Sequence, residues 1–411
     1  MRNSRPAFFL IILVLSVLAM DSPEPSKPAS APLPDLPLIK LRPQPIRAVQ
    51  VLSMDCSSWA QVEDRFKRFR EAGVNTVIMR VFQNPGDIFY QFARPTKSVG
   101  VYFQTDEALV VDDILGPLCT LAHRNDLELF AWMTTRYADY GMEDREGLAC
   151  RAYDLGRREY VRTRGLSVIL PEVRSHLVRL YRDLARYPID GILIQDDLIL
   201  HHNEDFNPRV MRIYQLSTGK ESLPSRFYQG IYRDHQGRFL VQEYTPDFWE
   251  WSRWKRDRLL DLADELRRAA IAERVQKPGL KFGINFYYET VTAPEHALAW
   301  FSQELEPAVS RRYDFYAIML YHRQMQKELG LSKARTQSLV KKGTQYACKV
   351  VGDPGKVLLK LQTVDFERGT RIPNSEMSEL FSIFLQEPRA GWALIPAGPG
   401  LDLAWLSRQY H

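Results

Sequence analysis

The sequence predicts an α/β protein built as a single (β/α)8 TIM barrel with insertions. Two observations support this fold. From residue 47 onward, short apolar segments alternate with amphipathic segments in eight units. In the fourth unit, an apolar run after Pro188 ends abruptly in Asp196 and Asp197, which is where a barrel strand would present an active site. An open doubly wound sheet is the alternative, but the chain lacks the glycine-rich phosphate loop expected after its first strand.

Each predicted strand is a short apolar run, and the predicted helices carry a helical apolar period. The predicted strands are residues 47–55, 74–82, 127–134, 189–197, 280–287, 313–321, 356–363 and 391–396. The predicted helices are residues 58–72, 113–124, 170–187, 206–217, 246–273, 295–310, 332–348, 375–385 and 401–410. Residues 136–166 are polar and show no period, so we expect a long loop that is functional or disordered.

The N-terminal segment is expected to lie outside the barrel. Arg2 and Arg5 precede an apolar run over residues 7–20, which fits a signal peptide better than a membrane span. Residues 1–20 are therefore predicted as a signal peptide or an N-terminal anchor that contacts the membrane. Residues 21–46 are a proline-rich linker, and residues 47–411 form the domain. This organisation predicts a periplasmic or secreted protein.

Composition excludes some classes of partner and leaves others open. The formal charge of +5 is spread over 411 residues without a block of five like charges, so no nucleic-acid partner is expected. The chain is 45% hydrophobic, enough for a large core. The four cysteines lack CxxC spacing, and one or two pairs could form disulfides in an oxidising compartment.

The residues predicted at the strand ends are mostly carboxylates, amides and aromatics. They are Asp55, Arg80, Gln83, Trp132, Asp196, Asp197, Asn285, Tyr287, Glu289, Tyr321, His322, Gln362 and Asp365. Glycoside hydrolysis needs a carboxylic acid near the leaving oxygen and a second group that stabilises an oxocarbenium-like centre. A phosphate would require clustered cations or helix N-termini. The set therefore favours a carbohydrate substrate.

Strand alternation makes Asp197 the first candidate for catalysis. Gly191, Leu193, Gln195 and Asp197 would share one side of the strand, and the small and polar members suit the barrel interior. Asp197 is then the principal acid/base or nucleophile, with Asp196 as its partner. Capping of the next helix, or pairing with an arginine such as Arg80, is the structural alternative.

The second catalytic carboxylate stays open among Glu204, Glu289 and Asp365. A pair about 5 Å apart would indicate a retaining enzyme, and a pair about 6.5–9.5 Å apart an inverting one.

Several residues have structural interpretations that compete with functional ones. Trp132 could be a sugar platform or a core residue, and His322 more often has a structural role than a catalytic one. Four aromatic residues at helical spacing are expected to pack in the core: Phe248, Trp249, Trp251 and Trp254. No metal or cofactor is expected. Adjacent His201 and His202 rarely reach one ion together, even with Glu204 and Asp205 nearby, and no GxSxG motif is present.

Several sequence blocks carry a family resemblance. They are Ala131-Trp132-Met133, Asp190 to Asp197 with Glu204-Asp205 downstream, Trp251 to Arg256, and Tyr313 to Met319. In their order and spacing the chain from Arg47 onward resembles the C-terminal glycoside-hydrolase-like domain of periplasmic poly-β-1,6-N-acetylglucosamine N-deacetylases. The resemblance implies a (β/α)8 barrel that binds, and in members hydrolyses, partially de-N-acetylated β-1,6-glucosamine polymer of the biofilm matrix. It maps the family's acidic pair onto Asp196 and Asp197. Glu204 and Asp205 would add negative charge that attracts the polymer's ammonium groups.

The chain departs from the family pattern at two places. His202 stands five positions after Asp197, where the family has an acid, and residues 321–324 lack the glutamate found beyond strand six. The deacetylase domain is also expected to be absent. The leading hypothesis is an exported glycoside hydrolase that cleaves a hexosamine exopolysaccharide internally. The alternatives are a non-catalytic polysaccharide-binding module that works with export components, and a hydrolase of a different glycan.

Overall fold

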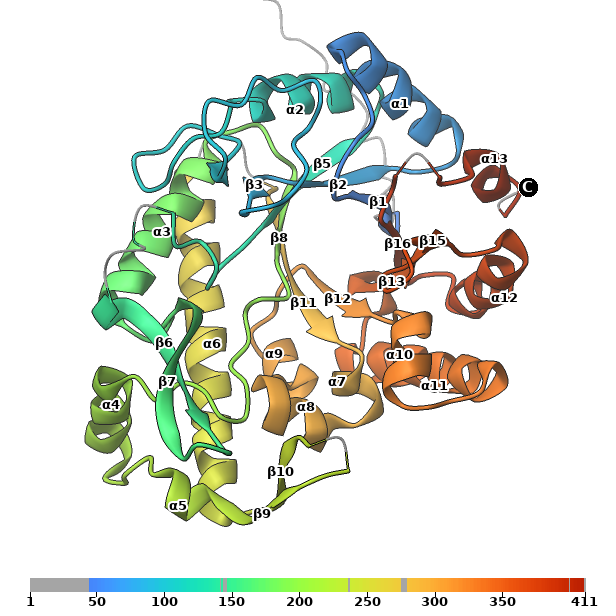
Figure 1. Ribbon diagram of the computed structural model, residues 1–411. Helices are drawn as coiled ribbons and strands as arrows, with labels where there is room; N and C mark the ends of the chain where they lie inside the picture. The colour runs from blue at the N-terminus through green and yellow to red at the C-terminus, as the bar shows by residue number, and fades with distance from the viewer. Residues whose placement is uncertain are drawn as a thin grey trace, which may run out of the picture. The chain divides into compact units, whose positions relative to one another are not determined.

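Eight parallel strands close into a barrel in the computed structural model (Figure 1), so the (β/α)8 prediction is confirmed. The structure describes residues 44–140, 142, 146–235, 237–274, 279–398 and 400–409. The predicted signal peptide and nearly all of the predicted linker lie outside these residues. The barrel strands are β1 (Arg47–Val51), β2 (Thr76–Arg80), β5 (Glu128–Met133), β8 (Gly191–Ile194), β11 (Lys281–Tyr287), β12 (Phe315–Met319), β13 (Val357–Gln362) and β16 (Gly391–Ile395).

Helices surround the barrel on its outside, as Figure 1 shows. They are α1 (Trp59–Glu71), α2 (Leu115–Arg124), α3 (Pro171–Ala185), α6 (Pro246–Glu273), α8 (Pro294–Phe301), α9 (Leu305–Val309), α11 (Lys333–Val351), α12 (Asn374–Leu385) and α13 (Leu403–Ser407). The predicted helix at residues 295–310 is therefore two helices. A left-handed residue, Ser302 with φ 51°, ends the first of them.

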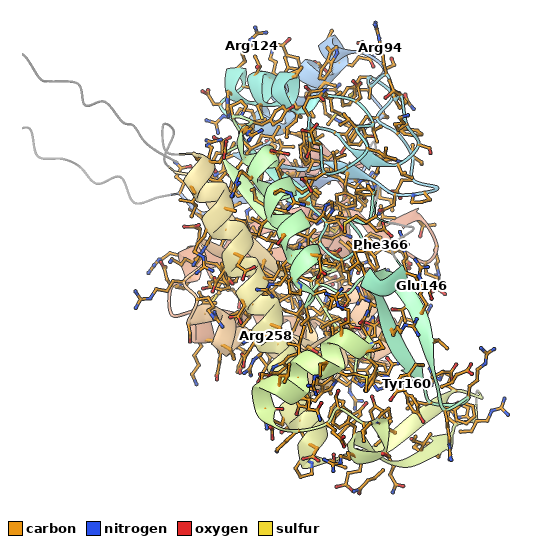
Figure 2. All side chains as sticks on the ribbon, turned by 90° about the vertical axis from the view of Figure 1, so that its left-hand side faces the viewer. Arg94, Arg124, Glu146, Tyr160, Arg258 and Phe366 are labelled. Atoms are coloured by element: carbon orange, nitrogen blue, oxygen red, sulfur yellow. The ribbon has the colours of Figure 1, made fainter. Side chains whose placement is uncertain are left out.

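Insertions follow several strands where the chain leaves the barrel. They contain β3 (Phe82–Gln83), β4 (Gly100–Val101), η1 (Glu146–Leu148), β6 (Ala149–Asp154), β7 (Glu159–Leu166), α4 (Pro208–Thr218), α5 (Pro224–Phe227), β9 (Tyr228–Arg233), β10 (Phe239–Tyr244), α7 (Glu289–Thr292), α10 (His322–Glu328), β14 (Val364–Asp365) and β15 (Thr370–Arg371). The short helix η2 (Pro354–Lys356) instead leads into β13. In Figure 2 the labelled residues Glu146, Tyr160 and Phe366 lie toward the same side of the barrel. Residues 136–166, expected as a loop, contain the antiparallel pair β6–β7.

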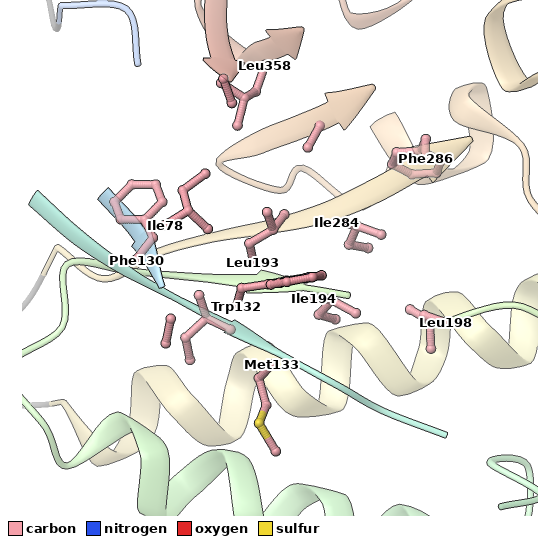
Figure 3. Packing of buried hydrophobic residues seen from close by; sticks show 14 of the residues in the cluster. Ile78, Phe130, Trp132, Met133, Leu193, Ile194, Leu198, Ile284, Phe286 and Leu358 are labelled. Carbon is pink, nitrogen blue, oxygen red and sulfur yellow. The ribbon is translucent and has the colours of Figure 1, made fainter. Parts of the chain in front are cut away.

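The barrel interior is filled by side chains that alternate along each strand. Trp132 and Leu193 point into the barrel, whereas Met133 points toward the surrounding helices (Figure 3). A Cβ atom on Gly191 would lie 2.7 Å from the ring of Phe130. Glycine is required here because the aromatic ring already occupies the space.

The long helix α6 buries the aromatic residues that the sequence predicts as packing. Trp251 is fully buried and stacks on Phe206, with ring centroids 6.0 Å apart, and on Trp254 at 5.1 Å. Phe248 is also fully buried. The packing interpretation of this aromatic group is confirmed.

All four cysteines carry free thiols in buried positions. Burial raises the pKa of the Cys150 thiol well above its usual value. The disulfide option is therefore not realised in this structure. Within the described residues, no helix combines the length and apolar character needed to cross a membrane.

Candidate active site

Asp196 lies in the turn after β8, and its carboxylate is at the open end of the barrel. β8 ends at Ile194, and Asp196 is half-buried two residues later. The hydroxyl of Tyr287, the last residue of β11, lies 3.5 Å from Oδ2 of Asp196. Burial, together with the charge of Asp196, raises the pKa of both Tyr287 and Tyr321 well above 10. Both phenols therefore stay neutral beside the carboxylate and can donate hydrogen bonds.

Lys360 supplies a positive charge inside the barrel next to this carboxylate. It lies on β13, is 1% exposed, and donates from Nζ to Oδ1 of Asn285 at 2.8 Å. Its ammonium lies 5.8 Å from the centre of the Tyr321 ring. Burial lowers the pKa of Lys360 to about 7, and the charge of Asp196 opposes that shift. Asp196 and Lys360 are thus electrostatically coupled.

Asn285 fixes the ends of the strands that carry these groups. Its Nδ2 donates to the carbonyl oxygen of Ile194 at 2.8 Å, which ties β11 to the residue where β8 ends. Nε2 of Gln303 donates to the carbonyl oxygen of Asn285 at 3.1 Å, and the amide of Tyr287 donates to Oε1 of Gln303 at the same distance. These bonds limit the movement of Asp196 and Tyr287 relative to each other.

Asp197 lies beyond the end of β8 at Ile194, so the predicted strand to residue 197 is too long and strand alternation does not decide the orientation of Asp197. The strand ends before it, and residues 196–197 form a turn. Asp197 is 3% exposed and accepts hydrogen bonds from the hydroxyls of Thr134 and Thr135, at 2.7 and 2.9 Å, and from the amides of Thr135 and Tyr137. Burial raises the pKa of Asp197 and these donors oppose the shift. Asp197 therefore anchors the segment after β5, and a catalytic role for it stays a prediction.

Glu204 and Asp205, predicted to add negative charge near the substrate, are both buried. Glu204 is buried and accepts two hydrogen bonds from the guanidinium of Arg136, at 2.8 and 3.1 Å. Arg136 overcomes the effect of burial and lowers the pKa of Glu204 to about 2. Asp205 is fully buried and accepts from Ser167 and from the amides of Arg151 and Asn207. Both carboxylates thus have partners within the protein, and their role in attracting a cationic polymer stays a prediction.

His201 and His202, just before Glu204, contact an aromatic ring, a hydroxyl and a backbone carbonyl. The ring of His202 lies 4.7 Å from that of Trp300, and its Nδ1 lies 3.2 Å from the Tyr244 hydroxyl. Burial lowers the pKa of His202 to about 3, so it is neutral. Nδ1 of His201 faces the carbonyl oxygen of Trp300 at 3.1 Å. Among the residues that the structure describes, no three His, Cys, Asp or Glu side chains are grouped to hold a metal ion.

Four other candidates have structural partners. Asp55 pairs with Arg65 at 3.1 Å, and Arg80 pairs with Asp87 at 3.0 Å. Nε2 of His322 lies 2.8 Å from Glu376 of α12. Oε1 of Gln362 accepts the amides of Arg323 and Gln324, at 2.9 and 3.2 Å, and so fixes the start of α10. The structural interpretation of His322 is supported, and the substrate-binding roles of the four stay predictions.

Trp132 fills the barrel interior but keeps one polar atom available. It is 7% exposed and packs edge-on against Phe82 at 5.6 Å. Its buried Nε1 has no hydrogen-bond partner within the described residues, and neither do Oε1 of Gln195 or both side-chain polar atoms of Gln50. These side chains come from β5, the end of β8, and β1. Buried polar atoms without partners are unfavourable unless a ligand or water satisfies them. Substrate hydroxyls could do so here.

Glu289 differs from the other carboxylates because burial favours its neutral form. It is the first residue of α7, is 6% exposed, and its Oε2 has no partner among the described residues. Burial, helped by the charge of Glu328, raises the pKa of Glu289 to about 7. The Tyr288 hydroxyl donates to Oε2 of Glu328 at 2.8 Å. Glu289 is thus available as an acid near neutral pH.

The structure brings together Asp196, Asn285, Tyr287 and Tyr321 from the predicted set. The sequence interpretation missed Lys360 and Gln50. A signal for Lys360 exists, because it is the one charged residue within the apolar segment Val357–Gln362. The glutamine on β1 gave no such signal, since nothing local distinguishes it from a solvent-facing side chain.

The sequence also matches a known family. Residues 60–389 match GHL13, hypothetical glycosyl hydrolase family 13. The chain belongs to this family. No curated protein matches the chain. The protein is thus a member of a glycoside hydrolase family with the barrel described above.

Solved structures of glycoside hydrolases share the fold. The PgaB (BpsB) glycoside hydrolase domain from Bordetella bronchiseptica is 19% identical, with a TM-score of 0.64 over 86% of this chain and 94% of that one. The catalytic domain of a β-amylase from Paenibacillus polymyxa is 10% identical, with a TM-score of 0.54 over 89% and 98% of the two chains. The first likeness agrees with the family resemblance that the sequence suggests.

Proposed function

We propose that the protein hydrolyses internal glycosidic bonds of a hexosamine polysaccharide, with Asp196 as the carboxylate at the reacting centre. The observation that carries this proposal is the position of Asp196. It is half-buried at the open end of the barrel, 3.5 Å from the Tyr287 hydroxyl and coupled to buried Lys360. Active sites of (β/α)8 enzymes lie at this end.

Glu289 is the proposed proton donor because the other candidates cannot hold a proton at neutral pH. The pKa of Glu204 is lowered to about 2 by Arg136. Asp365 accepts hydrogen bonds from the backbone amides of Glu367 and Arg368, and these bonds lower its pKa below the usual value. Of these three carboxylates, Glu289, with its pKa of about 7, matches the requirement that a catalytic acid be protonated at the working pH.

In the proposed reaction, Glu289 donates its proton to the glycosidic oxygen as the bond from C1 to that oxygen breaks. Asp196 stabilises the positive charge that develops at C1, and water supplies the hydroxyl that ends on C1. The second proton of that water restores a carboxylic acid. Lys360, whose ammonium interacts with the charge of Asp196, and the Tyr287 hydroxyl, 3.5 Å from Oδ2 of Asp196, are in place beside this carboxylate before the reaction begins.

The substrate proposal is partially de-N-acetylated poly-β-1,6-N-acetylglucosamine, acted on in the periplasm or outside the cell. It is supported by the family membership, by the sequence blocks shared with the deacetylase-associated domain, and by the barrel shared with the PgaB domain. Aromatic side chains lie near Asp196 on the neighbouring strands, since Tyr287 stacks on Phe301 at 4.4 Å and Tyr321 contacts Phe366 at 5.5 Å. Such rings suit stacking against the sugar units of a long chain.

Release of oligosaccharides from the purified polymer tests the proposal. The wild-type protein is expected to produce short soluble fragments, and Asp196→Asn is expected to produce none. A non-catalytic binding module is the second candidate, favoured by His202 where the resembling family has an acid. Polymer binding without fragments from the wild-type protein would establish that candidate and reject hydrolysis.

A further inference from the structure

A groove of about 550 Å³ lies between α10 and the turn that joins β14 to β15. We call it the Phe366 groove. Its lining residues are Arg323, Gln324, Gln326, Lys327, Glu328, Gln362, Asp365, Phe366, Glu367 and Arg368. Its volume lies within the usual range of about 300–1,000 Å³ for small-molecule sites. None of the catalytic groups proposed above lines it.

Two contacts connect the groove to the candidate active site. Tyr321 connects the two, because it feels the charge of Asp196 and its ring meets that of Phe366 edge-on at 5.5 Å. Glu328 lines the groove and accepts the hydrogen bond of Tyr288, the residue before Glu289. A chain bound across Asp196 could therefore extend into this groove.

Phe366 presents an apolar surface that internal packing leaves uncovered. Its side chain is 47% exposed in a short turn. Amide and carboxylate groups surround it, including Gln326 and the pair in which Nε2 of Gln324 donates to Oε1 of Glu328 at 2.9 Å. An aromatic face with hydrogen-bonding groups at its edge matches a pyranose ring, which has apolar faces and a rim of hydroxyls.

The charged side chains of the groove balance, so the groove has no excess of positive charge that would favour a strongly anionic ligand. Three cationic side chains, Arg323, Lys327 and Arg368, face three anionic ones, Glu328, Asp365 and Glu367. Arg323 is also held by Glu376 at 2.6 Å. Lys327 and Glu367 connect the two walls through an exposed ion pair at 2.6 Å, and such pairs contribute little free energy and can open. The balance suits a polymer of neutral and singly cationic sugars.

We propose that the Phe366 groove is a subsite that binds a hexosamine residue on one side of the bond to be cleaved, with the sugar ring stacked on Phe366. The identity of the polymer rests on the proposed function above. The groove adds a proposed path for the bound polysaccharide, which runs from Asp196 past Tyr321 to the turn between β14 and β15.

Oligosaccharide binding in an Asp196→Asn background tests this subsite without requiring turnover. The probe is a β-1,6-linked glucosamine hexasaccharide, measured by calorimetry. Phe366→Ala is expected to weaken binding roughly fivefold to tenfold, which corresponds to about 1–1.4 kcal/mol. Phe366→Leu keeps an apolar contact with Tyr321 but removes the aromatic face, and should weaken binding as well. Phe366→Tyr should restore it.

Tyr232→Ala is the matched control, because Tyr232 is 48% exposed on β9 and lies outside the groove. Equal binding by the Phe366→Ala and Tyr232→Ala variants would overturn the subsite. Loss of binding in Phe366→Ala, with wild-type protein that releases no fragments, would reject the proposed hydrolysis and keep the subsite. Fragment release by the wild-type protein, with no effect of Phe366→Ala on binding, would support the proposed hydrolysis and reject the subsite.

Discussion

Nζ of Lys360 lies 2.8 Å from Oδ1 of Asn285 inside the barrel, and Asp196 is the carboxylate whose charge acts on that ammonium. A buried lysine needs a compensating partner, because removing its charge from water is costly. Here the compensation comes from a side chain that also ties β11 to the end of β8. The cation therefore links the geometry of the strands to the electrostatics of the candidate active site.

Lys360→Met is expected to lower activity while leaving the protein folded. The substitution removes the positive charge beside Asp196 but fills much of the same space, and it leaves Oδ1 of Asn285 without its donor, so we expect a loss of about 1–3 kcal/mol in unfolding free energy. We expect kcat to fall by about one to two orders of magnitude, since the preorganised charge at the reacting centre is lost. Fragment release and thermal unfolding measure the two effects, and a folded variant with wild-type activity would contradict this role.

The same variant should change how stability depends on pH. The folded-state pKa of Lys360 is about 7, below the value of about 10.4 in an unfolded chain. Between these values the unfolded state binds one more proton than the folded state, so this lysine makes stability rise with pH by about 1.4 kcal/mol per pH unit. Unfolding of Lys360→Met measured from pH 7 to 10 should show a correspondingly smaller slope.

Lys255 is the control for that measurement. It is fully buried on α6, its pKa is also lowered to about 7, and it donates to the carbonyl oxygens of His201 and Glu204. Lys255→Met should reduce the slope similarly but should destabilise the protein more than Lys360→Met, because two buried carbonyl oxygens lose their donor. Identical unfolding free energies for the two variants would argue against a distinct environment for Lys360.

Substitutions of Asp196 and Asp197 should affect different properties, the first activity and the second stability. Asp196→Asn removes a half-buried charge at the open end of the barrel and is expected to abolish turnover with little effect on unfolding. Asp197→Asn places an amide among donors from the segment after β5, where the carboxylate accepts hydrogen bonds from four donor groups of Thr134, Thr135 and Tyr137. We expect a loss of about 2–3 kcal/mol in unfolding free energy. Urea unfolding measures it, and a stable but inactive Asp197→Asn would restore Asp197 as the catalytic group.

These two residues show how far sequence reasoning reaches. The eight strands and their order could be predicted, because each is a continuous apolar run whose character depends on local sequence. The end of β8 could not be placed closely enough to orient the adjacent carboxylates. A difference of three residues, from the predicted 197 to the observed Ile194, places Asp197 in a turn instead of a strand.

The partners of the site residues could be predicted even less well. Arg136 and Glu204 are 68 positions apart, so nothing local reveals that the arginine neutralises the glutamate. The Phe366 groove could not be predicted for the same reason, because its walls come from α10 and a turn after β13 and meet only in the folded protein. Conversely, the fully buried Trp251 on α6 was predicted from its helical spacing alone.

In a Lys360→Met background, which removes the other group with a pKa of about 7 beside Asp196, Glu289→Gln is expected to remove the alkaline limb of the pH–rate profile. Glu289 has a pKa of about 7, so the proton it donates is lost as pH rises through neutrality, and wild-type activity should fall above pH 7. The variant should lose about two to four orders of magnitude on a natural glycoside. The loss should be smaller on an aryl glycoside whose leaving group needs no protonation. An unchanged alkaline limb in Lys360→Met/Glu289→Gln would exclude Glu289 as the acid.

Arg136 and Glu204 should behave as a buried ion pair whose partners depend on each other. Arg136→Met leaves the Glu204 carboxylate buried without its counter-charge, so we expect a loss of about 3–5 kcal/mol in unfolding free energy. Arg136→Lys should recover little of it, since a lysine cannot reproduce the two parallel bonds at 2.8 and 3.1 Å. The pKa of Glu204, lowered to about 2, adds stability above about pH 4.3 that is lost as pH falls toward 2.

The exposed pair of Arg209 and Glu172 is the matched control for this last prediction. It has similar two-oxygen contacts, at 2.6 and 2.8 Å, but its side chains are 47% and 50% exposed. Arg209→Met should therefore cost no more than about 1 kcal/mol, because water screens the charges. The double variant Arg136→Met/Glu204→Met should lose much less than the sum of its single variants, since it leaves no unpaired charge behind. Additive losses in urea unfolding would show that the two residues stabilise the fold independently and would contradict the paired role assigned to them.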